Sequence, residues 1–286
     1  MNSKLILGTV QFGIPYGINN SMGLLNEQGV TKILAKGHSA GILTLDTAAA
    51  YGEAEKRIGN FHQESNKKFK VITKFNKDKS ISWNDSIEHS LKNLIVEKVE
   101  TIMFHSYEAY NENSSKIAEI ISEGKGKFFN NIGVSVYTNQ ELKNLIEDQN
   151  IDVVQLPFNL LDNHSARSEL LLKLKSKGKI IHTRSCFLQG LFFKDLNNLP
   201  TILLPLKYEL HKIQKLANEY SISVGQMALN YVLQKEYVDG VLIGVDSLQQ
   251  LDQNLSYAND KISEELSQKI DKLSVGHPHL LNPSTW

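Results

Sequence analysis

This sequence has a single cysteine, no net charge and no long apolar run. Cys186 is the one cysteine among 286 residues, which excludes an intrachain disulfide framework and fits a reducing compartment. Lys+Arg and Asp+Glu both number 31, and no block of five or more like charges occurs, so the charges indicate neither a nucleic-acid nor a membrane partner. Because the N-terminus lacks a signal-peptide pattern and no apolar run approaches the roughly 18 residues of a membrane span, we expect a cytoplasmic protein.

What the sequence does contain is a repeating alternation of two kinds of segment. Short apolar runs rich in β-forming residues recur, and each is nearly continuous rather than alternating, which is typical of strands buried on both faces of a parallel sheet. The eight runs are residues 4–10, 42–46, 70–74, 99–105, 131–136, 153–158, 179–184 and 239–245.

Helical periodicity fills the segments between these runs. In residues 84–98, four apolar residues share one helix face, and Asn84 or Asp85 is expected to cap the start. The four are Ile87, Leu91, Leu94 and Ile95. The same period occurs in residues 138–148, 169–179 and 209–220. Eight strand–helix units without a dividing linker predict an α/β fold, namely one (β/α)8 TIM barrel domain over residues 1–286.

Polar residues stand where the predicted strands end, which is where such barrels carry their active sites. They are Asp46, Lys74, His105, Ser135 and Arg184, while Gln155 lies within the sixth strand and Tyr51 follows Asp46 in the loop DTAAAYG. A free tyrosine, with a pKa of about 10, is a poor acid at neutral pH. A lysine ammonium beside a tyrosine stabilises the phenolate, a carboxylate holds the lysine in place, and a histidine orients a carbonyl. These residue types together indicate a proton-transfer site.

Each of these residues also has an ordinary structural explanation when it is taken alone. Asp46 could be a helix N-cap, Lys74 a solvated strand end and Tyr51 half-buried packing. His105 could be a hydrogen-bonded loop histidine, and Gln155 could satisfy a buried backbone group. Their shared position at one end of the predicted barrel favours the joint site.

The strings around these residues resemble the aldo-keto reductase superfamily over essentially the whole chain. The strings are LGTVQFG, DTAAAYGEAEKRIG, ITK, FHS, GVS, QLPFN, RSCFLQGL and GVDSLQQLDQNL. The resemblance implies a catalytic tetrad of Asp46, Tyr51, Lys74 and His105. It implies that the cofactor lies on Gly8, Thr9 and Asp46, with Ser135 and Gln155 on the nicotinamide carboxamide and Arg184 where many relatives place a stacking aromatic.

The resemblance also implies a nicotinamide dinucleotide, although a GxGxxG fingerprint is absent and GKGK at 124–127 does not fit its spacing. Many relatives hold the 2′-phosphate of NADP with a Lys-Ser pair and a later arginine. Those positions here are Gly244, Val245 and Gln250, while Asn254 keeps the adenine position and Ser247 begins a helix that can bind phosphate. We therefore expect NADP(H) to be favoured over NAD(H) by a modest factor only.

The predicted function is reduction of a small-molecule aldehyde or ketone. The strings PYGI, QLPFNLLD and RSCFLQGL resemble the branch of bacterial surface-polysaccharide and nucleotide-sugar pathways, so the resemblance implies a sugar or sugar-nucleotide carbonyl. One alternative is a dinucleotide-binding regulatory or scaffold subunit with little turnover, which the intact tetrad disfavours. Another is a metal-dependent barrel hydrolase, which would need an HxH or carboxylate cluster at the strand ends. We expect no metal site, and the sequence makes no prediction of oligomeric state.

A few residues remain outside this scheme. His277 and His279 are expected in a surface loop rather than on a metal, and Cys186 as a small buried hydrophobe. Arg184 is open between an anionic substrate group and the cofactor. The aromatic residues expected to line the substrate pocket are Trp83, Tyr107, Phe187 and Trp286.

Overall fold

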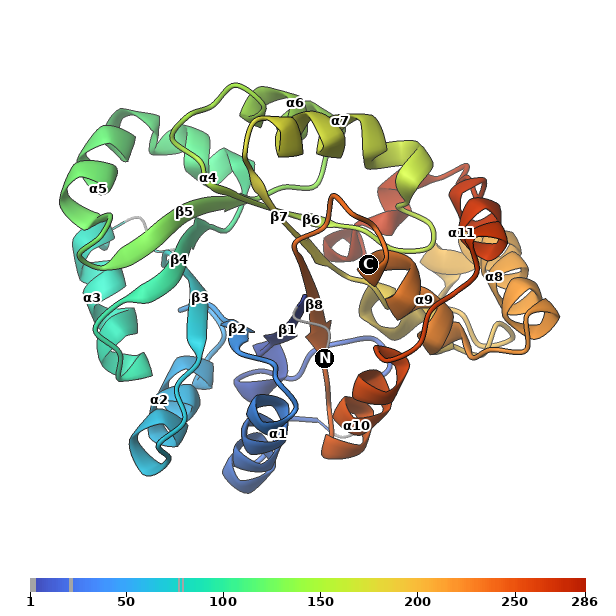
Figure 1. Ribbon diagram of the computed structural model, residues 1–286, viewed down its shortest axis with the longest axis horizontal. Helices are drawn as coiled ribbons and strands as arrows, with labels where there is room; N and C mark the ends of the chain where they lie inside the picture. The colour runs from blue at the N-terminus through green and yellow to red at the C-terminus, as the bar shows by residue number, and fades with distance from the viewer. Residues whose placement is uncertain (1–3, 21–22, 77, 79) are drawn as a thin grey trace.

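Eight parallel strands close into one barrel in the computed structural model, and helices surround it (Figure 1). The model describes residues 4–286 except 21–22, 77 and 79. The strands are β1 (Leu5–Gly8), β2 (Thr44–Asp46), β3 (Lys70–Lys74), β4 (Val99–Phe104), β5 (Phe129–Ser135), β6 (Val153–Pro157), β7 (Ile180–Arg184) and β8 (Gly240–Gly244). Each strand pairs with the next along the chain, and β8 pairs with β1. The predicted (β/α)8 barrel and its single domain are therefore confirmed.

The helices surround the barrel from the blue α1 and α2 to the orange α8–α10, and the red α11 lies beside α8 (Figure 1). They are α1 (Glu27–Ser39), α2 (Ala54–Glu64), α3 (Trp83–Leu94), α4 (Tyr107–Glu112), α5 (Ile117–Gly124), α6 (Asn139–Leu145), α7 (His164–Ser176), α8 (Lys207–Glu219), α9 (Val224–Leu233), α10 (Leu248–Tyr257) and α11 (Glu264–Asp271). Short 3-10 helices include η1 (Val10–Phe12), η3 (Leu188–Phe193) and η4 (Thr201–Leu206). Within the described residues, no helix is both long and apolar enough to cross a membrane.

The core has two layers, as a barrel covered by helices requires. A small cluster fills the inside of the barrel and consists of Ile6, Ile72, Met103, Val153 and Leu242. A much larger cluster packs the outer faces of the strands against the helices. The strands are thus buried on both sides, which explains why their sequences are continuously apolar.

The helix predicted within residues 84–98 forms, but both of its ends differ from the expectation. Ser82, rather than Asn84 or Asp85, caps α3, and its side chain accepts a hydrogen bond from the Asp85 amide. Ile95 adopts a left-handed conformation at the other end, and 41% of it is exposed, whereas the other three apolar residues of the predicted face are buried. The helix ends one residue too early to place Ile95 on its apolar face.

The buried His62 on α2 makes the stability of the folded protein depend on pH. Its Nδ1 lies 2.9 Å from the Leu94 carbonyl, and its Nε2 accepts the Phe69 amide proton over 3.2 Å. Burial lowers the pKa of His62 below its ordinary value of 6.5. Because a second ring proton would displace the Phe69 amide, the folded protein holds this ring neutral while the unfolded chain protonates it.

We therefore predict that the contribution of the neutral His62 ring to the free energy of unfolding is fully present above pH 6.5. This contribution is lost as the pH is lowered below that value. The contribution of one such group is at most about 1.4 kcal/mol per pH unit. Urea unfolding at pH 7.5 and 5.5 measures it, and His62→Gln, which keeps an acceptor but does not titrate, should reduce the pH difference. His277→Gln, at an exposed position, serves as the control. An equal pH difference in wild type and His62→Gln would disprove this role.

Candidate active site

A cavity of about 470 Å³ opens at the carboxyl ends of the strands, which is the size of a small-ligand pocket. The ends of β1, β2, β6, β7 and β8 contribute to it, together with the loops after β1 and β7 and the helices α9 and α10. Among the residues expected from the sequence to form the site, those that line the cavity are Gly8, Thr9, Asp46, Tyr51, Gln155, Arg184, Gly244, Gln250 and Asn254.

Lys74 and Asp46 form a buried ion pair at the base of this cavity. Lys74 Nζ lies 2.6 Å from Asp46 Oδ1, and each side chain is only 4% exposed. The same ammonium donates to the Thr47 carbonyl over 2.9 Å, and the Gln155 amide donates to Asp46 Oδ2 over 2.8 Å. Both carboxylate oxygens therefore have donors, as a buried carboxylate needs.

This pairing keeps the lysine charged. Burial acts to lower the pKa of Lys74, but the charge of Asp46 and its hydrogen bond outweigh burial, so that the pKa lies above its ordinary value. Lys74 is consequently an ammonium at neutral pH, although it has almost no contact with solvent.

The Tyr51 ring lies beside this ammonium and lines the cavity. Lys74 Nζ is 5.4 Å from the centroid of the Tyr51 ring. The His105 ring stands edge-on to the same tyrosine, with centroids 6.5 Å apart and an angle of 76° between the ring planes. The four residues expected to act together therefore do cluster, with Asp46 and Tyr51 in the cavity wall and Lys74 and His105 next to them.

Two glycines hold the Tyr51 loop against η1. A Cβ on Gly13 would lie 1.6 Å from the Tyr51 carbonyl oxygen and 2.8 Å from the Ala54 amide. Gly52 has φ +53°, and a Cβ there would lie 2.5 Å from the Gly13 carbonyl oxygen. The two backbone segments thus touch directly, which only residues without side chains allow.

Glu55, the last acidic residue of the DTAAAYGEAE string, holds the start of α2 to β3. Its side chain is 2% exposed, and it accepts a hydrogen bond of 2.6 Å from Thr73 Oγ1. Thr73 directly precedes Lys74, so this bond connects the tyrosine loop to the strand that carries the lysine. Sequence reasoning assigned Glu55 no role of its own, since burial of a carboxylate has no local signature.

Two residues expected to contact the cofactor lie outside the cavity lining. Ser135 is buried at the end of β5, paired in register with Gln155. Ser247 is the N-cap of α10, and its side chain accepts from the Gln250 amide. Gln250 in turn accepts from the Asp246 amide over 2.7 Å, so the β8–α10 loop is tied to its own helix.

Arg184 is the one arginine without a carboxylate partner in the described structure. Arg57 pairs with Glu27, and Arg167 pairs with Asp162. The Arg184 guanidinium instead stacks 4.0 Å from the centroid of the Tyr137 ring and donates to the Val136 carbonyl over 3.2 Å. It therefore brings a positive charge into the cavity wall.

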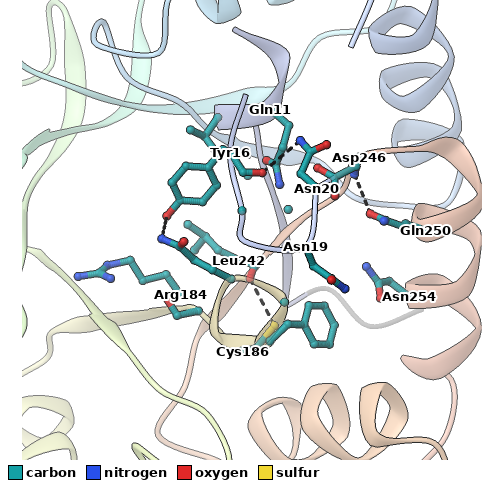
Figure 2. Close-up of a pocket in the computed structure, with 18 of the residues that line it drawn as sticks. Gln11, Tyr16, Asn19, Asn20, Arg184, Cys186, Leu242, Asp246, Gln250 and Asn254 are labelled. Atoms are coloured by element: carbon teal, nitrogen blue, oxygen red, sulfur yellow. Dashed lines mark hydrogen bonds between the residues drawn. The ribbon is translucent and has the colours of Figure 1, made fainter. Parts of the chain in front are cut away.

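The structure adds lining residues that sequence reasoning missed. Tyr16 and Asn19 from the loop after β1 meet Gln189 and Gly190 from the loop after β7, and all four line the cavity. The Gln189 amide donates to the Tyr16 hydroxyl over 2.7 Å (Figure 2), and a Cβ on Gly190 would lie 2.8 Å from Asn19 Cβ. Such a contact spans 173 residues of sequence and has no local signal.

Two further lining residues, Gln11 and Asp246, were also missed (Figure 2). Gln11 directly follows the LGTV string, and Asp246 lies between the predicted cofactor residues Gly244 and Ser247. An acidic residue at that place was the available signal.

Of the aromatic residues expected around the substrate, only Phe187 lines the described cavity. Trp83 Nε1 donates to Glu119, and Trp286 Nε1 donates to the Leu280 carbonyl. Tyr107 packs against Tyr110, with ring centroids 6.2 Å apart. The expectation was wrong for these three because it rested on their position in loops and not on where their rings point.

The remaining predictions concern Cys186 and the two C-terminal histidines. Cys186 is 1% exposed, as expected of a small buried hydrophobe, and burial raises the pKa of its thiol to about 12. His277 and His279 are exposed, with ring centroids 5.9 Å apart. In the described part of the chain, no group of three or more His, Cys, Asp or Glu side chains is arranged to hold a metal ion.

The barrel with its cavity at the strand ends places the chain among (β/α)8 proteins, and comparison with known proteins defines the family. The model of the aldo/keto reductase family matches residues 4–275. The chain therefore belongs to the aldo/keto reductase family and is an oxidoreductase that reduces carbonyl compounds. Members of this family use nicotinamide dinucleotide coenzymes.

Individual relatives agree with this assignment. The chain is 25% identical to L-glyceraldehyde 3-phosphate reductase of Escherichia coli O157:H7 over 99% of this chain and 94% of the relative. It is 24% identical to L-galactose dehydrogenase of Arabidopsis thaliana over 94% and 89% of the two chains. The holo form of aldo-keto reductase AKR11C1 from Bacillus halodurans has the same fold, with a TM-score of 0.73, 19% identity and coverage of 94% and 91%.

We predict that Gly13→Ala destabilises the protein by about 1–3 kcal/mol, because the new methyl group displaces the backbone of the Tyr51 loop. Urea unfolding measures the change. Gly276→Ala is the matched control, since a Cβ there has no atom within 4 Å, and it should leave stability almost unchanged. Equal stability of the two variants would show that the Gly13 contact is not needed.

Proposed function

We propose that the protein is an NAD(P)H-dependent reductase of aldehydes or ketones in which Tyr51 donates the proton to the carbonyl oxygen. The observation that carries the proposal is the buried Lys74–Asp46 ion pair next to the Tyr51 ring at the base of the cavity. Burying an ion pair costs more free energy than burying apolar residues of similar size, so a buried charged lysine in a cavity indicates a functional role.

The cavity suits a nicotinamide dinucleotide. It continues from Asp46 and Tyr51 at the strand ends to Asn254 on α10, so an elongated ligand fits along it. Gly244 keeps this path open, since a Cβ there would lie 2.7 Å from the Gln11 side-chain nitrogen. When bound, the nicotinamide supplies the hydride that reduces the carbonyl carbon.

The residues proposed to hold the coenzyme divide along the same path. Gln155 would face the nicotinamide with its amide oxygen, because its amide nitrogen is occupied by Asp46. Gly8 and Thr9 would lie beside it at the end of β1. Gln250 and Asn254 would contact the nucleotide end, and the buried Ser135 and the capping Ser247 would act by supporting their neighbours.

The protein's part in the chemistry is to hold and move a proton. Tyr51 donates its hydroxyl proton to the carbonyl oxygen, and the Lys74 charge, 5.4 Å from the ring centroid, stabilises the phenolate that remains. Asp46 holds the ammonium in place through its 2.6 Å contact. His105, edge-on to the tyrosine, is positioned to orient the carbonyl oxygen.

We propose that the substrate is the aldehyde or ketone of a sugar or sugar nucleotide. Two relatives are named for small polyhydroxylated compounds, L-glyceraldehyde 3-phosphate and L-galactose. The cavity has polar side chains suited to hydroxyl groups, among them Asn19, Asn20 and Gln189. Arg184 adds a positive charge near the strand ends, where it would meet an anionic group of the substrate or the coenzyme.

Tyr51→Phe should retain coenzyme affinity and lower kcat by a factor of roughly 10² to 10⁴, because only the proton donor is removed. Oxidation of reduced coenzyme at 340 nm with a panel of aldehydes and keto-sugars measures turnover, and fluorescence titration measures binding. Tyr16→Phe is the matched control, since that tyrosine also lines the cavity but its hydroxyl accepts a hydrogen bond from Gln189. It should keep turnover within a few-fold.

Activity of Tyr51→Phe within a few-fold of wild type would show that another group is the acid. Wild-type protein that binds the coenzyme and turns over none of the panel would instead favour a binding subunit without catalysis.

Lys74→Met should lower kcat and move the alkaline limb of the pH–rate profile to higher pH, because the positive charge that stabilises the phenolate is lost. Measurement of kcat between pH 5 and 10 checks this. A shape of the profile identical to wild type, with activity retained, would exclude the proposed role. Lys70→Met, at the exposed start of the same strand, is the control.

A further inference from the structure

The proposed function places the nicotinamide at Asp46 and Tyr51, and the inference that follows rests on that placement. The cavity continues from these residues to the β8–α10 loop, so the adenosine half of the coenzyme can extend along that loop. Figure 2 shows Asp246, Gln250 and Asn254 together on one side of the cavity and Arg184 on the other. A coenzyme that extends this way would have its adenosine ribose beside the β8–α10 loop.

Asp246 provides the charge at this end. Three residues with a formal charge line the described cavity, namely Asp46, Arg184 and Asp246. Asp46 is neutralised by Lys74, and Arg184 lies across the cavity. Asp246, in the β8–α10 loop, forms no ion pair in the described structure, in contrast to Asp252 on α10, whose carboxylate lies 2.8 Å from Lys36 Nζ.

The described surroundings of Asp246 contain polar groups rather than cations. Burial raises the pKa of Asp246, and hydrogen bonding from Gln250 and Gln11 acts in the opposite direction. Within the described part of the chain, the groups that act on this carboxyl include neither a lysine nor an arginine. As far as the described residues show, the nucleotide end of the cavity lacks the fixed positive charge that favours a bound phosphate monoester.

The side-chain groups at the nucleotide end of the cavity also offer hydrogen-bond acceptors. Asp246 Oδ1 and Gln11 Oε1 are buried and have no hydrogen-bond partner among the described residues. A ribose hydroxyl donates a hydrogen bond, whereas a phosphate dianion offers only acceptors and a like charge. The two oxygens thus match the 2′- and 3′-hydroxyls of NAD(H) and oppose the 2′-phosphate of NADP(H).

We propose that Asp246 makes the protein select NAD(H) over NADP(H), by accepting a hydrogen bond from the adenosine ribose and repelling a 2′-phosphate. This preference is the reverse of the one expected from the sequence, which considered Gly244, Val245 and Gln250 but not the carboxylate between them. Asp246 is thus a specificity-determining residue, and it takes no part in proton transfer.

Titration of the full-length protein with NADH and with NADPH, followed by coenzyme fluorescence, tests the proposal. Wild type should bind NADH at least about tenfold more tightly than NADPH. Asp246→Asn, which removes the charge but keeps an acceptor oxygen, should tighten NADPH binding about tenfold. Asp246→Ala should also weaken NADH binding by several-fold, because the acceptor is lost.

Asp252→Asn is the control for a carboxylate lost from the adjoining helix α10, and it should leave both affinities unchanged. Circular dichroism and thermal unfolding verify that each variant is folded. Tighter binding of NADPH than of NADH by wild type, or an NADH/NADPH ratio unaltered in folded Asp246→Asn, would overturn the selectivity and leave the reductase proposal standing. Failure of wild type to bind either coenzyme would overturn both.

Discussion

The ammonium of Lys74 and the carboxylate of Asp46 meet at the base of the cavity, where each side chain is only 4% exposed. Removing one partner from such a pair leaves an uncompensated buried charge and costs about 3–5 kcal/mol. The pair is possible because β2 and β3 are neighbours in register and because β6 supplies Gln155 for the second carboxylate oxygen. Closure of the barrel is therefore a condition for the site, since no local segment contains all three groups.

The rest of the site is organised around this pair by backbone contact. Tyr51 reaches its place beside Lys74 because the Gly13 and Gly52 backbones touch, and Glu55 binds the adjoining helix to Thr73 on the lysine strand. The backbone that carries Tyr51 is therefore held on one side by the glycine contact and on the other by the buried Glu55. A site on strand ends and tight turns is more rigid than one on long loops, which suits a reaction that requires precise orientation.

The barrel and the expected four-residue cluster could be predicted because they depend on local pattern. Continuous apolar runs indicate strands buried on both faces, and polar residues that end such strands must share one end of a barrel. The failures have a different physical origin. Ile95 left the predicted apolar face because a left-handed residue ended the helix, and three aromatics missed the cavity because ring direction depends on tertiary packing. Asp246 was passed over although its acidic side chain was visible in the sequence, because its importance depends on which described groups lie around it in the fold.

The single cysteine can be used to measure motion of the loop that carries it. Cys186 lies in the cavity wall between Ser185 and Phe187, yet it is 1% exposed, and its thiol points to the Leu242 carbonyl at 3.7 Å. Because burial raises the pKa of this thiol to about 12, a thiol reagent can modify it only after the β7 loop moves away from β8. The rate of labelling therefore measures how often that loop opens. Without any engineered probe, a ligand lying against the loop would be detected by the slowing of a single chemical reaction.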